Sequence, residues 1–357
     1  DMKQQKLGLD VKKKKPEKKI EKKTEEPVKR TKKRGSETAE SMAVRQRDIS
    51  VSEFFAKNRH LLGFDNPRKA LLTAIKEAVD NSLDACEDAG ILPDIIVEVK
   101  DLGNDRFRIV IEDNGPGIVK RQIPNIFGKL LYGSKFHRLK MSRGQQGIGI
   151  SAAGMYGMLT TGKPVEIVSR TGPGKPAHHF TLQIDTKKNK PEIISDTETD
   201  WEISNGTRVT IELEGKHTRG KQSIDEYLRQ TAIANPHVQM IYKEPGGEVI
   251  TYERSSSELP DHTSEIKPHP YGVELGVLQA MLKDTKARTV SSFLQSEFSR
   301  VTQRIAEEIC TNAAIGLNSR TSRVGRPEVE KLMQGIANTK IMNPPTNCVA
   351  PIGEEQL

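Results

Sequence analysis

The sequence predicts an α+β protein, in which a long amphipathic helix, a series of short strands and a helical C-terminal part follow one another. In the segment 70–89, apolar side chains recur at spacings of three or four: Leu72, Ile75, Val79, Leu83 and Cys86. Strand-like apolar runs lie between residues 95 and 243, separated by glycine, proline and polar residues. From Gly272 onward the helical spacing returns. We therefore expect a mixed helix and sheet domain followed by a helical module.

The composition limits the classes of protein to which this chain can belong. Its 357 residues are enough for two domains, and with only 4% aromatic residues the core must rest on aliphatic side chains. The three cysteines, Cys86, Cys310 and Cys348, are far apart, which indicates a reducing environment without disulfides or a structural zinc. The N-terminus has no hydrophobic signal core, and no apolar run approaches the roughly 18 residues of a membrane helix. We expect a soluble protein, not held by a membrane, in the cytoplasm or at the nucleoid, or in a eukaryotic nucleus.

The net charge of +8 is concentrated in the N-terminal tail. Residues 1–34 hold 15 Lys or Arg and 6 Asp or Glu, so the rest of the chain is close to neutral. A lysine-rich segment without aromatic residues buries too little apolar surface to order itself, and we expect residues 1–40 to be disordered. Such a tail could hold DNA through its phosphates or serve as a solubilising or targeting extension, and charge alone does not distinguish the two.

Three motifs together indicate a nucleotide site. Glu77, Asn81 and Asp84 share the side of the predicted helix opposite its apolar stripe, where a solvated polar face would be the ordinary interpretation. Downstream, Asp113-Asn-Gly-Pro-Gly117 follows a strand-like run, and Arg143-Gly-Gln-Gln-Gly-Ile-Gly149 opens a second helix. Glycine backbone can approach a polyphosphate closely, and the N–H groups and dipole at the start of a helix favour its negative charge.

The order and spacing of these motifs resemble the GHKL ATPase family, which includes gyrase, the heat-shock chaperone, histidine kinases and MutL. The resemblance implies a two-layer sandwich, with helices on one face of a mixed sheet, and a site for ATP and Mg²⁺. Within this family, the sequences of residues 77–93 and 132–137 resemble those of the B subunits of type II DNA topoisomerases. From this resemblance we expect an ATPase domain with an N-terminal strap at residues 41–255 and a helix-two-turns-helix module at residues 256–345.

The resemblance also implies roles for individual residues. Glu77 would be the general base that orients and deprotonates the attacking water, and Asn81 would bind Mg²⁺. Asp113 and Gly117 would hold adenine. Thr207 would reach adenine through an ordered water, although an ordinary β-branched strand residue is nearly as good an interpretation. In the resembled family a loop that corresponds to residues 132–142 is a lid over the nucleotide. From this lid and the glycine-rich loop, the phosphates would be contacted by Ser134, Lys135, Arg143, Gly144, Gln145, Gln146, Gly147, Ile148, Gly149 and Ile150.

Local patterns predict the remaining elements. A short amphipathic helix between Ser41 and Phe64 would pack through Val51, Phe54, Phe55, Leu61 and Leu62, and in the resembled family this segment embraces the second subunit. Strands are expected at 95–100, 107–112, 165–170, 178–185, 206–213 and 237–243, with a polar loop between 185 and 206. Helices are expected at 122–131, 223–234, 272–282, 290–311, 313–317 and 327–337. Neighbouring His178 and His179 would face opposite sides of a strand, which argues against a metal site there.

Five arginines of the helical module could contact DNA phosphates: Arg300, Arg304, Arg320, Arg323 and Arg326. Acidic neighbours such as Glu307 and Glu328 dilute the positive field, so solvated helix faces remain the preferred interpretation.

The function that the resemblance implies is an ATP-driven dimer gate. ATP would close a homodimer of B subunits in an A2B2 holoenzyme, so that the A subunit passes one DNA duplex through a double-strand break and relaxes supercoils. In that family a transducer domain, expected to start at residues 346–357, carries a lysine that reaches the γ-phosphate and the surface that binds the A subunit. We therefore expect a truncated chain. The alternatives are another ATPase of the same group, such as a MutL-like repair protein or a kinase, and a non-hydrolysing DNA-binding scaffold.

Overall fold

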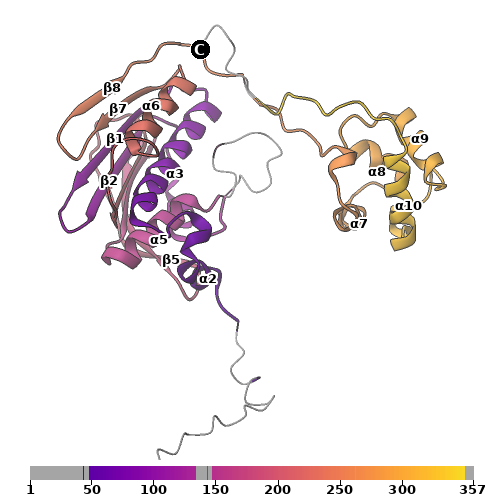
Figure 1. Cartoon of the computed structure of the whole chain (residues 1–357), viewed down its shortest axis with the longest axis horizontal. Helices are drawn as coiled ribbons and strands as arrows, with labels where there is room; N and C mark the ends of the chain where they lie inside the picture. The colour runs from indigo at the N-terminus through magenta and orange to yellow at the C-terminus, as the bar shows by residue number, and fades with distance from the viewer. Residues whose placement is uncertain (1–42, 44–47, 134–142, 144–146, 262, 350–357) are drawn as a thin grey trace, which may run out of the picture. The chain divides into compact units, whose positions relative to one another are not determined.

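The computed structural model describes residues 43, 48–133, 143, 147–261 and 263–349, and all structural statements below refer to these residues. They form a sheet covered by helices, followed along the chain by a group of helices with a core of its own (Figure 1). None of the helices described is long and apolar enough to cross a membrane.

The sheet has eight strands in the order β5-β4-β3-β6-β2-β1-β7-β8. Their bounds are β1 Asp94–Asp101, β2 Arg106–Asp113, β3 Val165–Thr171, β4 Ala177–Asp185, β5 Lys190–Thr199, β6 Asn205–Glu214, β7 Gln239–Lys243 and β8 Val249–Tyr252. Only the β1 and β7 pair is parallel among the pairs described. Side chains along β1 and β6 alternate between buried and partly exposed positions, because one face of the sheet carries the helices and the other does not.

Helices cover one face of this sheet, which confirms the two-layer prediction (Figure 1). They are α2 Val51–Lys57, α3 Pro67–Asp88, α4 Ile123–Gly128, α5 Gly149–Thr161 and α6 Ile224–Ala234, with short 3-10 turns at Arg59–Leu62 and Lys120–Gln122. Helix α3 packs on β1, β2 and β6, and α5 lies beside it on β6. Helix α3 and the start of α5 therefore meet over the centre of the sheet.

The central helix α3 begins where its sequence predicts. The Asn66 side chain accepts a hydrogen bond from the Arg68 N–H at 2.9 Å, and Pro67 occupies the first helical position, where its missing N–H costs nothing. Four of the five residues of the predicted apolar stripe are buried, with Ile75, Val79, Leu83 and Cys86 at 0% exposure, and Leu72 is partly buried. Burial of this stripe fixes the rotation of α3, and hence the direction in which its polar residues point.

Three local predictions in this part of the chain are wrong. The predicted polar loop between β4 and β6 contains the ten-residue edge strand β5, whose mostly polar residues need no second neighbour strand. The helix predicted at 122–131 is shorter, because Lys129 is already extended. Of the apolar contacts predicted for α2 and the turn after it, Val51, Phe54 and Leu61 are 37%, 40% and 55% exposed. Ser52 is buried instead, and it donates to the Asn189 side chain at 3.1 Å.

The C-terminal helices are α7 Leu275–Asp284, α8 Val290–Glu297, α9 Gln303–Asn312 and α10 Arg326–Ala337, with 3-10 turns at Pro270–Gly272 and Thr321–Arg323. Their core includes Leu278, Phe293, Leu294, Ile309, Cys310 and Leu332. The single long helix predicted at 290–311 is wrong: it breaks into α8 and α9 at Phe298, which is extended, and at Arg300, which has a φ of 60°. The break lets the Phe298 ring pack edge-on against the Phe293 ring, with 5.7 Å between the ring centroids. Residues 313–317 form turns rather than the predicted short helix.

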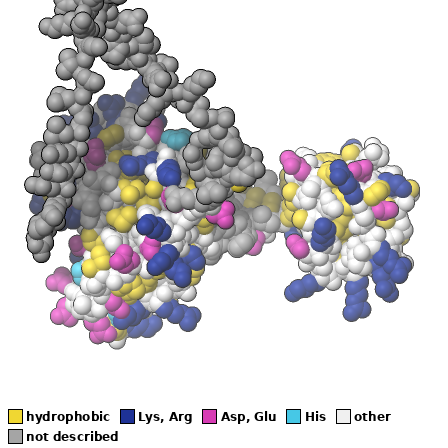
Figure 2. Space-filling view, turned by 90° about the horizontal axis from the view of Figure 1, so that it is seen from below, with side chains coloured by type: hydrophobic (Ala, Val, Ile, Leu, Met, Phe, Trp, Pro, Cys, Tyr) yellow, Lys and Arg dark blue, Asp and Glu magenta, His cyan; other side chains and the backbone are white. Residues whose placement is uncertain are grey.

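On the side of the C-terminal helices seen in Figure 2, Lys and Arg side chains gather along one edge. Two of the five arginines named above have protein partners: Arg300 donates to the Asn343 carbonyl at 3.0 Å, and Arg326 pairs with Glu330 at 3.3 Å. Contact between these arginines and DNA stays a prediction.

Candidate nucleotide-binding site

A cavity of about 300 Å³ lies between α3, the end of β2, the start of β6 and the start of α5. Eight of the residues that the sequence assigns to nucleotide binding line it: Glu77, Asn81, Asp113, Gly117, Gly147, Gly149, Ile150 and Thr207. Apolar side chains, among them Ile118, Ile126, Phe127 and Val209, form part of the same wall. Apolar walls with a few directed polar groups suit a flat heteroaromatic base.

Asp113 is the most buried carboxylate of the cavity. It is the last residue of β2 and is 7% exposed. One carboxylate oxygen accepts from the Ser82 hydroxyl at 2.9 Å, and the other accepts from the backbone N–H groups of Gly115 at 2.9 Å and Thr207 at 3.2 Å. Burial raises the pKa of Asp113 to about 6 in spite of these donors. The three donors fix the carboxylate in one orientation at the bottom of the cavity.

Gly117 and Thr207 lie beside this carboxylate. Gly117 has a φ of 69°, and a Cβ there would overlap the Arg170 carbonyl of β3, so only glycine fits. Thr207 is the strand partner of Asp113, and its hydroxyl lies 3.1 Å from that of Ser169 on β3. Ser169 also accepts from the Ile118 N–H at 2.8 Å. Hydroxyl groups and fixed backbone thus surround the position next to Asp113.

Glu77 lies directly against the start of α5. The clearance at Gly149 is so small that a Cβ there would overlap the Glu77 carboxylate. Gly149 is the first residue of α5, and no described side chain caps this helix. The N–H groups of its first turn therefore combine with the helix dipole into a site that favours an anion. Glycine at position 149 lets a carboxylate and this helix terminus face the same space.

Oxygen atoms of the kind that coordinate a divalent cation line the cavity. Asn81 lines the cavity one turn of α3 after Glu77, and the carboxylates of Asp84 and Asp88 line it further along the helix. Among the residues described, no group of three or more His, Cys, Asp or Glu forms a metal centre by itself. This donor set fits Mg²⁺, which keeps several waters and is usually held by one or two protein oxygens together with substrate phosphates.

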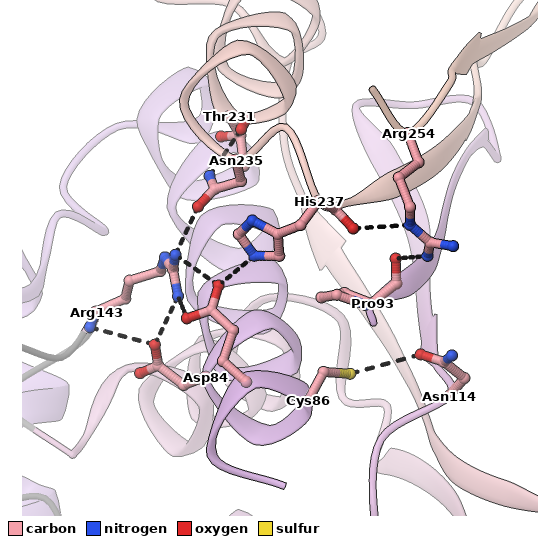
Figure 3. Close-up of polar contacts among 10 residues, drawn as sticks. Asp84, Cys86, Pro93, Asn114, Arg143, Thr231, Asn235, His237 and Arg254 are labelled. Carbon is pink, nitrogen blue, oxygen red and sulfur yellow. Dashed lines mark hydrogen bonds and ion pairs between the residues drawn. The ribbon is translucent and has the colours of Figure 1, made fainter. Parts of the chain in front are cut away.

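Arg143 does not line the cavity. Its guanidinium donates to Asp84 at 3.0 Å, to both carboxylate oxygens of Glu87 at 2.7 and 2.9 Å, and to the Asn235 side chain at 2.6 Å (Figure 3). Ile148 is buried and precedes α5 without lining the cavity. Five predicted residues lie outside the described part of the chain: Ser134, Lys135, Gly144, Gln145 and Gln146.

Sequence reasoning missed Ser82 and Ser169. Ser82 follows Asn81 directly and reads as an ordinary helical residue, while Ser169 lies in a strand of mixed pattern. Both matter because of groups that are distant in the sequence: Asp113 for Ser82, and Thr207 for Ser169. No local signal distinguishes them.

Comparison with known proteins agrees with this geometry. Residues 66–217 match the family described as "Histidine kinase-, DNA gyrase B-, and HSP90-like ATPase". Residues 66–217, which include α3, α5 and all the residues that line the cavity, therefore form a GHKL-type ATPase domain.

More specific matches come from curated archaeal proteins, each named as the B subunit of type 2 DNA topoisomerase 6. The protein of Methanococcoides burtonii is 50% identical over 320 residues, which are 89% of this chain and 51% of the relative. That of Archaeoglobus fulgidus is 48% identical over 317 residues, 88% of this chain and 52% of the relative. Among solved structures, the ATPase region of Saccharomyces cerevisiae topoisomerase II has a TM-score of 0.44 and 13% identity, over 58% of this chain and 62% of that one.

Over 88–89% of its length the chain is similar to the B subunits of type 2 DNA topoisomerase 6. It spans about half the length of the curated relatives it matches.

Proposed function

We propose that this chain binds ATP with Mg²⁺ in the cavity, hydrolyses it, and acts as the nucleotide-driven gate of a type II DNA topoisomerase. The observation that carries the proposal is the contact between the Glu77 carboxylate and the first residue of α5, in a cavity that also holds Asp113. It brings together a base and an anion-binding helix terminus, which phosphoryl transfer to water requires.

Asp113 supports adenine as the base. An ionised carboxylate fixed by Ser82, Gly115 and Thr207 accepts the exocyclic amino group of adenine, and the neighbouring apolar side chains cover the ring. Guanine presents a carbonyl oxygen at the corresponding position, which an ionised carboxylate would repel. The fixed orientation of Asp113 thus favours ATP over GTP.

Glu77 takes the role of general base. It accepts a proton from water while the water oxygen forms a bond to the γ-phosphorus, and the bond from that phosphorus to the bridging oxygen breaks, so that ADP leaves with the electron pair. The N–H groups at the start of α5 hold the phosphate oxygens. Mg²⁺, held through Asn81, would neutralise phosphate charge when bound.

The topoisomerase activity is proposed from the similarity of this chain to the B subunits of type 2 DNA topoisomerase 6. By this proposal ATP binding closes a homodimer of B subunits, and hydrolysis reopens it, while the partner A subunit cleaves and rejoins double-stranded DNA in an A2B2 assembly. Nearly half of each relative lies outside the matched region, so the complete reaction belongs to the longer protein.

Substitution of Glu77 tests the hydrolytic site. Glu77→Ala should lower ATP turnover by about 100-fold or more while leaving the affinity for a non-hydrolysable ATP analogue within a few-fold, because only the base is removed. Asn81→Ala should instead weaken Mg²⁺-dependent binding. Asp80→Asn is the matched control on the same helix, since Asp80 bonds to Tyr227 at 3.0 Å and does not line the cavity. Unchanged turnover in Glu77→Ala would exclude Glu77 as the base.

A further inference from the structure

A partly buried group of polar side chains joins the end of α3 to α6 and to the first residue of the glycine-rich segment. We call it the Arg143 cluster: Asp84, Glu87, Arg143, Asn235 and His237 (Figure 3). Arg143 binds Glu87 through both terminal guanidinium nitrogens. His237 is hydrogen-bonded to the same carboxylate, with 2.8 Å between its Nε2 and the Glu87 Oε1. Asn235 ends α6 and in turn donates to the Thr231 carbonyl at 2.7 Å. The cluster thus ties one arginine to two helices.

The burial of the cluster shows why its pairing is strong. The side chain of Arg143 is 23% exposed, that of Glu87 18% and that of Asp84 10%. Burial alone would raise the pKa of Glu87, yet the hydrogen bonds from His237 and Arg143 hold it below its ordinary value. A bidentate pair between arginine and a carboxylate is directional, and a buried carboxylate that loses its cation is costly. Arg143 is therefore held in one place.

That place lies next to the nucleotide site. The Arg143 backbone N–H donates to Asp84 at 3.4 Å, and Asp84 lines the cavity. Arg143 precedes Gly147 by four residues, which limits their separation to about 14 Å even in extended chain. Gly147 lines the cavity with a φ of 58°, and α5 starts two residues later. An anchor at residue 143 consequently restricts where the first turn of α5 can lie.

We propose that Arg143 is a positioning residue: Glu87 and Asp84 hold its guanidinium, and this fixes Gly147 and the start of α5 beside the nucleotide phosphates. The proposal rests on the proposed ATP site and replaces direct phosphate contact by Arg143, the role that the family resemblance implies. If Arg143 turned to the phosphates, it would leave Glu87 buried without its arginine.

Substitution of Glu87 distinguishes a positioning role of Arg143 from direct contact between Arg143 and the phosphates. It does not line the cavity, and a carboxylate repels phosphate, so its loss can weaken nucleotide binding only through the groups that it holds. The variants are Glu87→Ala, Arg143→Ala, their double mutant, and the milder Glu87→Gln and Arg143→Lys. The exposed pair Arg229 and Glu226 on α6, 3.0 Å apart, supplies the control as Arg229→Ala.

Two measurements are made on each variant. The first is affinity for a non-hydrolysable ATP analogue and for adenosine, which has no phosphates. We expect Glu87→Ala and Arg143→Ala each to weaken analogue binding about tenfold, while adenosine affinity stays within about twofold of that of the parent chain. The double mutant should bind the analogue no more weakly than either single mutant. The second is amide hydrogen exchange without nucleotide, where the first turn of α5 should exchange at least tenfold faster while the central strands stay protected.

Two results would overturn the proposal. One is weaker analogue binding in Arg143→Ala beside unchanged or tighter binding in Glu87→Ala, which would mean direct contact with phosphate. The other is unchanged hydrogen exchange at the start of α5 in both variants. If the parent chain bound no analogue, the proposed ATP site would fail, whereas the exchange measurement would still decide whether Arg143 positions α5.

Discussion

At the residue scale, Asp113 shows how position within the fold changes the chemistry of one side chain. In the sequence it is the first residue of an Asp-Asn-Gly turn, a common arrangement with no function of its own. In the structure it is buried, accepts three hydrogen bonds and has a raised pKa. Its ionisation near neutral pH then becomes a property of the site.

Nucleotide binding should therefore depend on pH through Asp113. Its pKa is about 6, and only the ionised form accepts the adenine amino group without competition from its own proton. Affinity for the ATP analogue should fall by up to about tenfold per pH unit below that value. Titration of binding between pH 5 and pH 8 measures this, and Asp113→Asn should bind weakly at every pH. A parent profile as flat as that of Asp113→Asn would contradict the assignment.

Ionisation of Asp113 also affects the stability of the fold, but folding favours the protonated form. Because the folded pKa of Asp113 is raised above the unfolded value of about 4, its stabilising contribution is complete below pH 4 and is lost as the pH rises through about 6. Nucleotide binding thus favours the ionised form of Asp113, whereas the stability of the fold favours the protonated form.

The sequence predicts the members of the site better than their arrangement. Glu77, Asn81 and Gly149 follow from motif spacing and family resemblance, and the structure brings them to one cavity. The overlap that any side chain at position 149 would make with Glu77 depends on the packing of α5 against α3, which no local pattern contains. The partners of Arg143 are unpredictable for the same reason, since Asn235 lies 92 residues away.

At the element scale, strong hydrophobic periodicity is enough to predict α3, α6 and α10, whereas edges and breaks are not predictable from it. Strand β5 lies at the edge of the sheet, so its side chains need not alternate clearly. The break between α8 and α9 places Arg300 at positive φ, a conformation that the sequence gives no reason to expect. In both cases tertiary packing decides the local structure.

Close packing of α9 and α10 gives a prediction about the helical core. A Cβ at Gly335 would lie 2.6 Å from the Ile309 carbonyl and 2.7 Å from the Ala313 Cβ. Gly335→Ala should lower the free energy of unfolding of this core by about 1 to 3 kcal/mol, because the helices must separate. Urea unfolding followed by circular dichroism measures the change. Gly276→Ala in α7, where a Cβ meets nothing within 4 Å, is the control and should be neutral or slightly stabilising. Equal effects of the two substitutions would contradict the packing argument.

At the scale of the whole molecule, the described chain has two hydrophobic cores. One runs from Phe64 to Tyr242 and the other from Val273 to Ile341, and no residue belongs to both. They fall within the ranges 41–255 and 256–345 expected from the sequence, while the exact boundaries of the domains stay predictions.

The gate proposal predicts a change of oligomeric state. Residues 1–357 should become dimeric with a non-hydrolysable ATP analogue and Mg²⁺, because the proposed gate closes only around bound nucleotide. Sedimentation with and without the analogue measures this change. Asp113→Asn, with its nucleotide binding weakened, is the control and should stay monomeric. A parent chain that binds the analogue and remains monomeric would refute the gate.

The sheet domain and the C-terminal helices each contain one buried cysteine, so the chain carries its own pair of chemical reporters. Cys86 on α3 and Cys310 on α9 are at most 1% exposed, while Cys348 is half-buried. Burial raises the pKa of both buried thiols, which keeps them unreactive until their surroundings open. With a thiol reagent, Cys348 should be labelled first, and the slower labelling of Cys86 and Cys310 should report the opening free energy of each core separately. Saturating nucleotide should slow the labelling of Cys86 and leave the labelling rate of Cys310 unchanged, because a ligand protects only the structure that binds it.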